Sequence, residues 1–324
     1  MPNARSVRSL LLCAVAALPL LASAAPQTAV AAPTPPARAV ALGDSFAAGE
    51  GLGPYLPGSD TTTDQCHRSD RAYPALLESS GVRRWRDVRS VACSGATTAT
   101  LLAGSAAEPS QLRALSGRTQ TVTLTIGGND VGFAAVLRDC VYAPPPAPAG
   151  LVPGAPGCSS RDDRAVTLAT ARLNGQAMPQ LLRRIHRRAP QARIYVTGYP
   201  RLFGLSFPGP AGCPVASLPL GGQQVPLFVT AADANWIRAK SDRLNAALES
   251  SVARARHQGV RARYVDVAGA FTGHNVCSTG TPWVNGLVVN PTNPPSVATA
   301  SFHPNALGQQ AYADAVAGAA RPRT

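Results

Sequence analysis

The sequence AVALGDSFAAGEG, residues 39–51, decides the fold class. Its first four residues are all apolar, which is typical of a short strand buried on both faces, and a glycine-rich polar turn follows at once. Similar apolar runs recur along the chain, at Val88–Ala92, Thr121–Ile126, Ile194–Thr197 and Tyr264–Val267. We therefore expect a mostly parallel central sheet of about five strands.

Helical patterns lie between these runs, at Tyr73–Ser79, Asp163–Arg188, Ala231–His257 and Asn305–Ala317. Strands that alternate with helices predict a three-layer α/β/α domain, in which helices cover both faces of the sheet. In such sheets ligands bind beyond the carboxyl ends of the strands. Residues 204–226 interrupt the alternation, and we expect an irregular insertion there.

The composition fits a packed globular domain better than a disordered or nucleic-acid-binding chain. Of the 324 residues, 45% are hydrophobic and only 15% are charged, which supplies a core and excludes a disordered polymer. The net charge of +13 rests almost wholly on arginine, because Lys240 is the only lysine. The arginines are scattered and lack stacking aromatic residues, so we expect no nucleic-acid partner and only a weak attraction to anionic lipid surfaces. We expect a monomer.

The first residues resemble an export signal. Arg5 and Arg8 precede an apolar run over residues 10–22, which is shorter than the roughly 20 residues that span a bilayer. Small residues allow cleavage after Ala24 or after Ala31. We therefore expect a secreted, extracellular protein. The expected organisation is a signal peptide at 1–31, a proline-rich tether at 32–38 and one domain at 39–322.

Export makes the cysteines candidates for disulfides. Cys13 lies in the apolar run, and the even number that remains predicts three disulfides, although the sequence does not fix their connectivity. Sequential pairing is our expectation: Cys66–Cys93, Cys140–Cys158 and Cys213–Cys277. No CxxC pair occurs, and the spacing of His67, Glu50, Asp64 and Asp70 matches no recurring ligand pattern, so we expect neither a metal nor a cofactor.

The proline-rich segment 143–157 is flanked by Cys140 and Cys158. So many prolines exclude a helix or a central strand, because proline lacks the N–H that both structures use. The segment either borders the substrate cleft or is a plain surface excursion.

Four short motifs carry the candidate chemistry. Ser45 follows the first strand, where a tight turn would expose its hydroxyl and its backbone N–H. Gly95 follows the second strand and offers an unobstructed N–H. Asn129, in GGND after the third strand, offers a side-chain amide. His303 precedes the last helix and, placed at the same rim, can deprotonate Ser45.

The order of these motifs resembles the SGNH (GDSL-type) hydrolase family over most of the chain, from about Ala39 to Ala317. The likeness extends to its secreted actinobacterial esterases and lipases, through residues 66–69 (CHRS), 72–74 (AYP) and 283–286 (WVNG). The absence of a G-x-S-x-G motif disfavours the α/β-hydrolase fold. The resemblance implies a flavodoxin-like domain that hydrolyses acyl esters. It also implies a role for each motif: Ser45 as nucleophile, His303 as general base, and an oxyanion hole of the Ser45 N–H, the Gly95 N–H and the Asn129 side chain.

One position departs from the family pattern. Many members carry an acid three residues before the histidine, where this chain has Ala300. Either a backbone carbonyl near Ala300 orients His303, or a distant acid such as Asp266 does; we favour the carbonyl. Asp44 and Asp130 are expected to brace their turns. The alternative functions are a polysaccharide deacetylase on the same scaffold and a non-catalytic secreted binding module, which the intact set of four residues disfavours.

Overall fold

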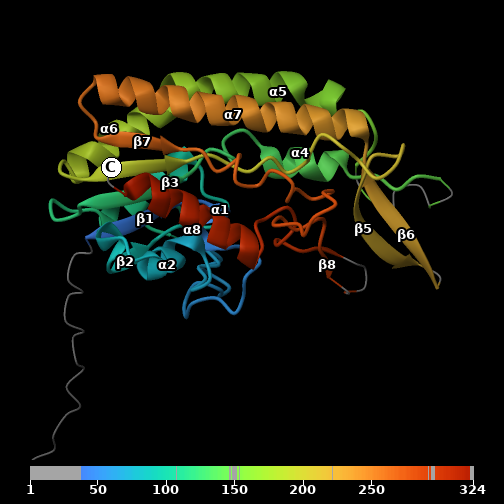
Figure 1. Ribbon diagram of the computed structural model, residues 1–324, viewed down its shortest axis with the longest axis horizontal. Coiled ribbons are helices and arrows are strands. Elements are labelled where there is room, and N and C mark those ends of the chain that lie inside the picture. Colours follow the sequence, from blue (N-terminus) through green and yellow to red (C-terminus); the bar gives the residue numbers. More distant parts are fainter. Residues whose placement is uncertain are drawn as a thin grey trace, which may run out of the picture. The chain divides into compact units, whose positions relative to one another are not determined.

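A computed structural model describes residues 38–321, apart from 107, 146, 148–151, 153, 221, 291 and 293–295. The expected signal peptide and all of the tether except Arg38 lie outside the described residues. Five parallel strands form the central sheet in the order β2-β1-β3-β4-β7 (Figure 1). Their bounds are β1 Ala39–Gly43, β2 Val88–Ser90, β3 Thr121–Thr125, β4 Arg193–Thr197 and β7 Ala262–Val265.

The strand order places a crevice next to β1. β1 pairs with β2 on one side and with β3 on the other, so that Ala39 lies opposite both Val88 and Thr121. The chain moves outward from β1 to β2 and then crosses back to β3, so its direction of growth reverses beside β1. Ligands bind at such reversals in open α/β sheets, beyond the carboxyl ends of the strands. The predicted flavodoxin-like α/β/α fold is confirmed.

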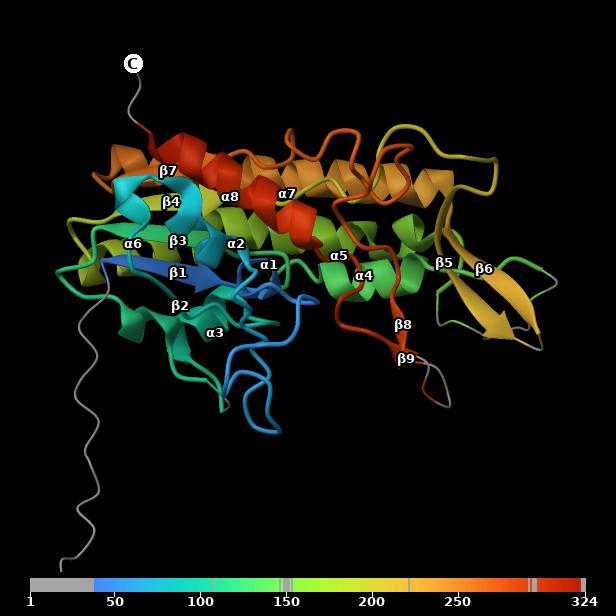
Figure 2. The ribbon, with the colours of Figure 1, turned by 60° about the horizontal axis from the view of Figure 1, so that its bottom comes forward.

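Helices cover both faces of the sheet, as expected (Figures 1 and 2). Successive strand residues point to opposite faces, so Ala39 belongs to one core and Val40 to the other. α2 and α8 contribute aromatic residues to the first core, while α6 and α7 contribute leucine and isoleucine to the second. The helix bounds are α1 Ser45–Ala48, α2 Tyr73–Leu76, α3 Thr98–Ala103, α4 Phe133–Cys140, α5 Cys158–Arg172, α6 Met178–Arg188, α7 Ala231–His257 and α8 Ala306–Ala320.

The helix predicted over 163–188 is present but has a wider turn in its middle. α5 continues through a π-helical turn, Leu173–Ala177, into α6. Pro179 lies in the first turn of α6 and cannot donate a backbone N–H, which accounts for a local change of hydrogen-bond pattern at this point.

The prediction of an irregular insertion at 204–226 was right for residues 204–212 and wrong for the rest. Two antiparallel strands, β5 (Cys213–Leu220) and β6 (Gln223–Val229), form a hairpin there. Prolines in both strands disguise the pattern, but each strand of a two-stranded ribbon has an outer edge on which proline is tolerated. A smaller hairpin joins β8 (Val289–Asn290) to β9 (Ser296–Val297), and both hairpins lie beyond the carboxyl ends of the sheet strands (Figure 2).

Three disulfides fasten the loops, in the sequential pairs given above as the expected connectivity. Cys66–Cys93 joins the loop after α1 to the loop after β2, and Cys140–Cys158 joins the end of α4 to the start of α5. Cys213–Cys277 joins β5 to the loop that follows β7. Within the described part of the chain, no helix combines the length and apolarity needed to cross a membrane.

Candidate active site

Ser45 is the first residue of α1, and one residue, Asp44, separates it from the end of β1. The approach is tight: a Cβ at Gly43 would lie 2.3 Å from the carbonyl oxygen of Thr125, so only glycine fits between β1 and β3. The Asp44 carboxylate caps α1 by accepting the Phe46 N–H at 3.1 Å. This turn holds Ser45 at the carboxyl end of the sheet.

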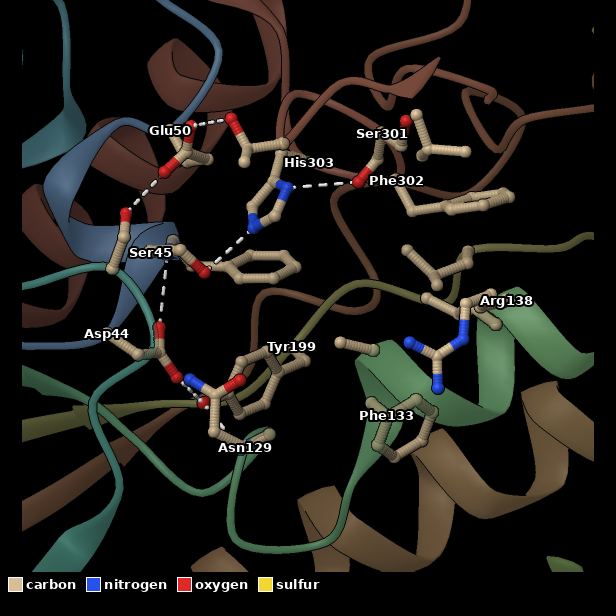
Figure 3. A pocket seen from close by; sticks show the side chains of 18 of the residues that line it. Asp44, Ser45, Glu50, Asn129, Phe133, Arg138, Tyr199, Ser301, Phe302 and His303 are labelled. Carbon is tan, nitrogen blue, oxygen red and sulfur yellow. Dashed lines mark hydrogen bonds between the residues drawn. The ribbon is translucent and has the colours of Figure 1, made fainter. Parts of the chain in front are cut away.

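His303 meets Ser45 across the fold. Its Nε2 lies 2.7 Å from Ser45 Oγ, and its Nδ1 lies 3.0 Å from the carbonyl oxygen of Ser301 (Figure 3). A carbonyl can only accept, so Nδ1 carries the proton and Nε2 has the free lone pair that a base needs. The residue before His303, Phe302, has the left-handed φ of 59°, which is uncommon outside glycine and turns the chain sharply at this point.

The group that orients His303 is therefore the carbonyl of Ser301, one residue beyond Ala300, near which we expected it. The Ala300 carbonyl accepts the backbone N–H of His303 at 3.2 Å and the Asn285 amide at 3.1 Å. Asp266 is exposed, and its carboxylate accepts the Ala268 N–H in the turn after β7. No contact joins Asp266 to His303.

The environment of His303 keeps the imidazole neutral. Burial lowers the pKa of His303 below its ordinary value of 6.5, because the charged form loses solvation. The negative charge of Glu50 and the carbonyls of Ser301 and Thr299 act in the opposite direction without cancelling the effect. At neutral pH, Nε2 is therefore free to accept a proton.

The cavity that contains Ser45 and His303 also contains three hydrogen-bond donors, namely the backbone N–H groups of Ser45 and Gly95 and the side-chain amide of Asn129. Gly95 has a left-handed φ of 78°, and a Cβ built there would meet nothing within 4 Å, so the space beside this residue is open. Within the described residues, neither the Gly95 N–H nor that of Ser45 has an acceptor. Asn129 Nδ2 donates one proton to the Ala96 carbonyl at 2.9 Å and keeps the other. The structure thus brings all four predicted residues together.

Two aspartates brace this site, as the sequence suggests. The Tyr199 hydroxyl donates to Asp44 and accepts the Gly128 N–H at 2.9 Å, so Asp44 supports the loop that carries Asn129. Burial raises the pKa of Asp44 to about 7. Asp130 accepts the backbone N–H of Thr98 at 3.0 Å and its hydroxyl at 2.5 Å.

Glu50 is a site residue that the motif analysis missed. Its side chain is only 2% exposed and accepts hydrogen bonds from the hydroxyls of Ser94 and Thr299, both at 2.5 Å (Figure 3). Tyr55 donates to it at 3.1 Å, and His67 Nδ1 lies 2.7 Å away. The sequence holds one signal: a glutamate stands between two glycines, directly after the turn of Ser45.

The cavity above Ser45 has a volume of about 440 Å³ and mostly apolar walls. α4 contributes Phe133 and Leu137, and Arg138 adds a guanidinium (Figure 3). Val152, from the proline-rich segment 143–157, also lines it. Of the two roles considered for that segment, its described residues support the one at the border of the cleft.

One cluster of metal-ligating residue types, Asp64, Cys66 and Glu108, occurs among the described residues. Cys66 is bound in a disulfide, and Arg68 bridges the two carboxylates, at 2.8 Å from each. The arginine already occupies the place of a cation between the acids. This cluster is an ion-pair network that fastens the loop after α1.

The comparisons with known proteins point to one family. Residues 41–311 match the GDSL-like lipase/acylhydrolase family. A lipase of Streptomyces rimosus is 33% identical over 294 residues, covering 90% of each chain. Lipase 1 of Streptomyces coelicolor is 34% identical over 270 residues, covering 83% of this chain and 81% of the relative.

Solved structures agree. A phospholipase A1 from Streptomyces albidoflavus NA297 superposes with a TM-score of 0.64 at 29% identity, covering 88% of this chain and 99% of its own. An extracellular lipase from Streptomyces rimosus superposes with a TM-score of 0.59 at 30% identity, covering 87% of this chain and 99% of its own. Fold, site and relatives together define a carboxylic ester hydrolase. The chain belongs to the GDSL-like lipase/acylhydrolase family, which confirms the resemblance seen in the sequence.

Proposed function

We propose that the protein is a secreted serine esterase or lipase that forms an acyl-enzyme on Ser45, with His303 as general base. One observation carries this proposal: the 2.7 Å contact between Ser45 Oγ and His303 Nε2, in a cavity that also holds three free donors. Neither a metal nor a cofactor enters the reaction as we propose it.

The proposed reaction has two halves that balance. His303 Nε2 takes the proton of Ser45 as Oγ attacks the ester carbonyl carbon, and the N–H groups of Ser45, Gly95 and Asn129 hold the oxyanion. Collapse of the tetrahedral intermediate breaks the bond between the carbonyl carbon and the alcohol oxygen, and the alcohol leaves with the proton from His303. Water then gives a proton to His303 and attacks the acyl-enzyme, and that proton returns to Ser45 as the acid departs.

The cavity supports esters with an apolar acyl part. Its walls favour an acyl chain because apolar surface gains free energy when it leaves water, and relatives named as lipases and a phospholipase A1 support lipid esters as substrates. Arg138 in the wall and the net positive charge, which is carried almost entirely by residues after the proposed signal peptide, favour substrates presented at anionic lipid surfaces. We further propose that the enzyme acts as a monomer.

We also propose that the chain is exported and that its first residues are removed. Arg5, Arg8 and the short apolar run after them support a signal peptide, and the three disulfides suit an oxidising compartment. The mass of the protein recovered from culture medium tests this: it should begin at residue 25 or 32. Retention of residues 1–24 in the extracellular protein would contradict the proposal.

Covalent labelling tests the reaction itself. A fluorophosphonate should modify the wild-type protein at Ser45, and Ser45→Ala should abolish both labelling and ester hydrolysis. Ser250→Ala, a serine on α7 away from the cavity, is the control and should retain both. An unlabelled wild-type protein would instead indicate a binding module.

Substrate class is separated by a second assay. p-Nitrophenyl esters of graded chain length and acetylated xylan should be compared with the same wild-type preparation. We expect hydrolysis of the p-nitrophenyl esters, with activity extending beyond the acetate. Activity confined to acetylated xylan would favour the deacetylase.

A further inference from the structure

The Ser45–His303 pair lacks an acid. His303 is oriented by the Ser301 carbonyl, which fixes the tautomer but carries no net charge to stabilise the imidazolium that forms when Ser45 attacks. We propose that Glu50 supplies this charge from a distance and holds the three loops of the site in register. This inference rests on the proposed function and makes Glu50 a positioning residue, since the hydrogen bonds of its carboxylate go to Tyr55, His67, Ser94 and Thr299 and to neither Ser45 nor His303.

The geometry assigns the positioning part. Glu50 belongs to the segment that begins at Ser45; Ser94 directly precedes Gly95, and Thr299 lies on the loop that carries His303. Both hydroxyls donate to the Glu50 carboxylate at 2.5 Å (Figure 3). One buried side chain therefore ties the segment of the nucleophile to those of the oxyanion glycine and the base.

The surroundings of Glu50 keep it charged. Burial opposes ionisation, but the hydrogen bonds from Ser94, Thr299 and His67 hold the pKa of Glu50 below its ordinary value. The resulting negative charge raises the pKa of His303 and so opposes the effect of burial on the imidazole. The charge thus favours the protonated imidazole, which is the form that the attack on an ester creates.

Other charged and titratable groups face this pair. His67 pairs with Glu50 through Nδ1 and lies 3.5 Å from Asp60 through Nε2, while the Tyr55 hydroxyl donates to Glu50. In the cavity, His303 shares the walls with Asp44, whose pKa of about 7 falls in the working range, and with Arg138. Because Asp44 titrates in every variant, the effect of Glu50 must be measured as a difference from wild type.

Glu50→Gln is the decisive variant, because it keeps the shape and an acceptor oxygen but removes the charge. Without the negative charge the protonated imidazole is less stable, so the acid limb of kcat/KM should move to lower pH by about one unit. Poorer alignment should lower kcat on the order of 10²-fold, with KM for a short ester little changed. Glu50→Asp, which restores the charge, should restore the wild-type acid limb.

A matched control is available at the start of α7. Asp233 is also a buried carboxylate; it accepts the N–H groups of Gly157 and Ser159 at 2.9 and 3.0 Å and does not line the cavity. Asp233→Asn should leave the acid limb and kcat unchanged. An equal shift in this control would overturn the specific role of Glu50.

Failure of this inference differs from failure of the proposed function. A wild-type protein that resists fluorophosphonate overturns the proposed function. A labelled, active wild type together with a Glu50→Gln variant of wild-type kcat and pH profile overturns only the role of Glu50. If Glu50→Gln does not fold, as judged by circular dichroism, Thr299→Val tests the tether: a fall in kcat with an unchanged acid limb supports the proposal, and full activity overturns it.

Discussion

Ser45 and His303 meet because the backbone at each has little freedom. Gly43 allows β1 to approach β3 before the turn into α1, and the left-handed Phe302 turns the chain immediately before the imidazole. Phe302 is buried against Phe203, with ring centroids 6.3 Å apart, so packing holds a conformation that costs about 1 kcal/mol or more for a residue other than glycine. The hydroxyl and the imidazole are therefore aligned before substrate arrives.

The Asn129 side chain should contribute through the transition state. Asn129→Ala removes one oxyanion donor, and we expect kcat to fall about 10²–10³-fold while KM changes little. Steady-state hydrolysis of a p-nitrophenyl ester measures this. Asn174→Ala, on the π-turn outside the cavity, is the control and should keep wild-type kcat. If the role of Asn129 were purely structural, Asn129→Ala would lose thermal stability but would retain the wild-type kcat.

The pH dependence should follow His303. Burial lowers the pKa of this imidazole from 6.5, so the base becomes protonated, and inactive, only at a lower pH than a free histidine would. Activity should thus rise with pH through an inflection below 6.5 and be established at neutral pH. The profile of kcat/KM against pH checks the expectation; an inflection above 6.5 would contradict it.

Sequence reasoning finds the groups that act near their own strand and misses those that act through distant contacts. Ser45, Gly95 and Asn129 each follow a strand, so the parallel sheet alone predicts that they gather at one edge. Glu50 is different, because the two partners that tie it to the other site loops, Ser94 and Thr299, lie 44 and 249 residues away. Nor does a sequence pattern reveal which carbonyl meets His303, since the left-handed turn at Phe302 decides it.

At the scale of elements, the buried strands and long helices follow from their hydrophobic patterns, whereas the hairpin of β5 and β6 does not. Pro214, Pro219 and Pro226 break the usual strand signal, and pairing within a ribbon outside the main sheet rescues them. The proline-rich segment 143–157 has no periodic pattern at all. The position of Val152 beside the cavity is consistent with the anchoring of the two ends of this segment by α4 and α5.

That anchoring predicts a stability effect. Replacing Cys140 and Cys158 together by alanine should reduce the free energy of unfolding by about 3 kcal/mol, because the reduced chain gains entropy when unfolded. For a domain of this size, each kcal/mol corresponds to roughly 2–4 °C in Tm. Differential scanning fluorimetry measures the change, and dithiothreitol should lower the Tm of wild type further, since it opens all three disulfides. An unchanged Tm in both experiments would refute the effect.

At the scale of the whole molecule, the net positive charge, to which the proposed signal peptide contributes only Arg5 and Arg8, and the apolar cavity serve the same proposed substrate. Long-range attraction depends on the summed charge, whereas the cavity decides which part of a lipid is held. The composition gives the net charge directly. The cavity depends on side chains from several separate segments that meet in one place, and the sequence does not show this.

Binding to lipid surfaces should be electrostatic and sensitive to salt. The protein with Ser45→Ala, which cannot consume its substrate, should sediment with vesicles of phosphatidylglycerol and much less with vesicles of phosphatidylcholine. Raising the ionic strength from about 0.05 to 0.5 M should release it, because the screening length falls several-fold over that range. Equal binding to both vesicles, unaffected by salt, would show that apolar contacts alone drive adsorption.

The bond between Cys66 and Cys93 has a consequence for the cell that makes the protein. It ties the loop after α1 to the residue just before Ser94 and Gly95, so the segment that carries the Gly95 donor gains its covalent anchor only once those thiols are oxidised. Inside the cytoplasm, where thiols stay reduced, a newly synthesised chain would hold this corner loosely. The exported lipid hydrolase proposed above would then reach its full activity as it leaves the cytoplasm and not before.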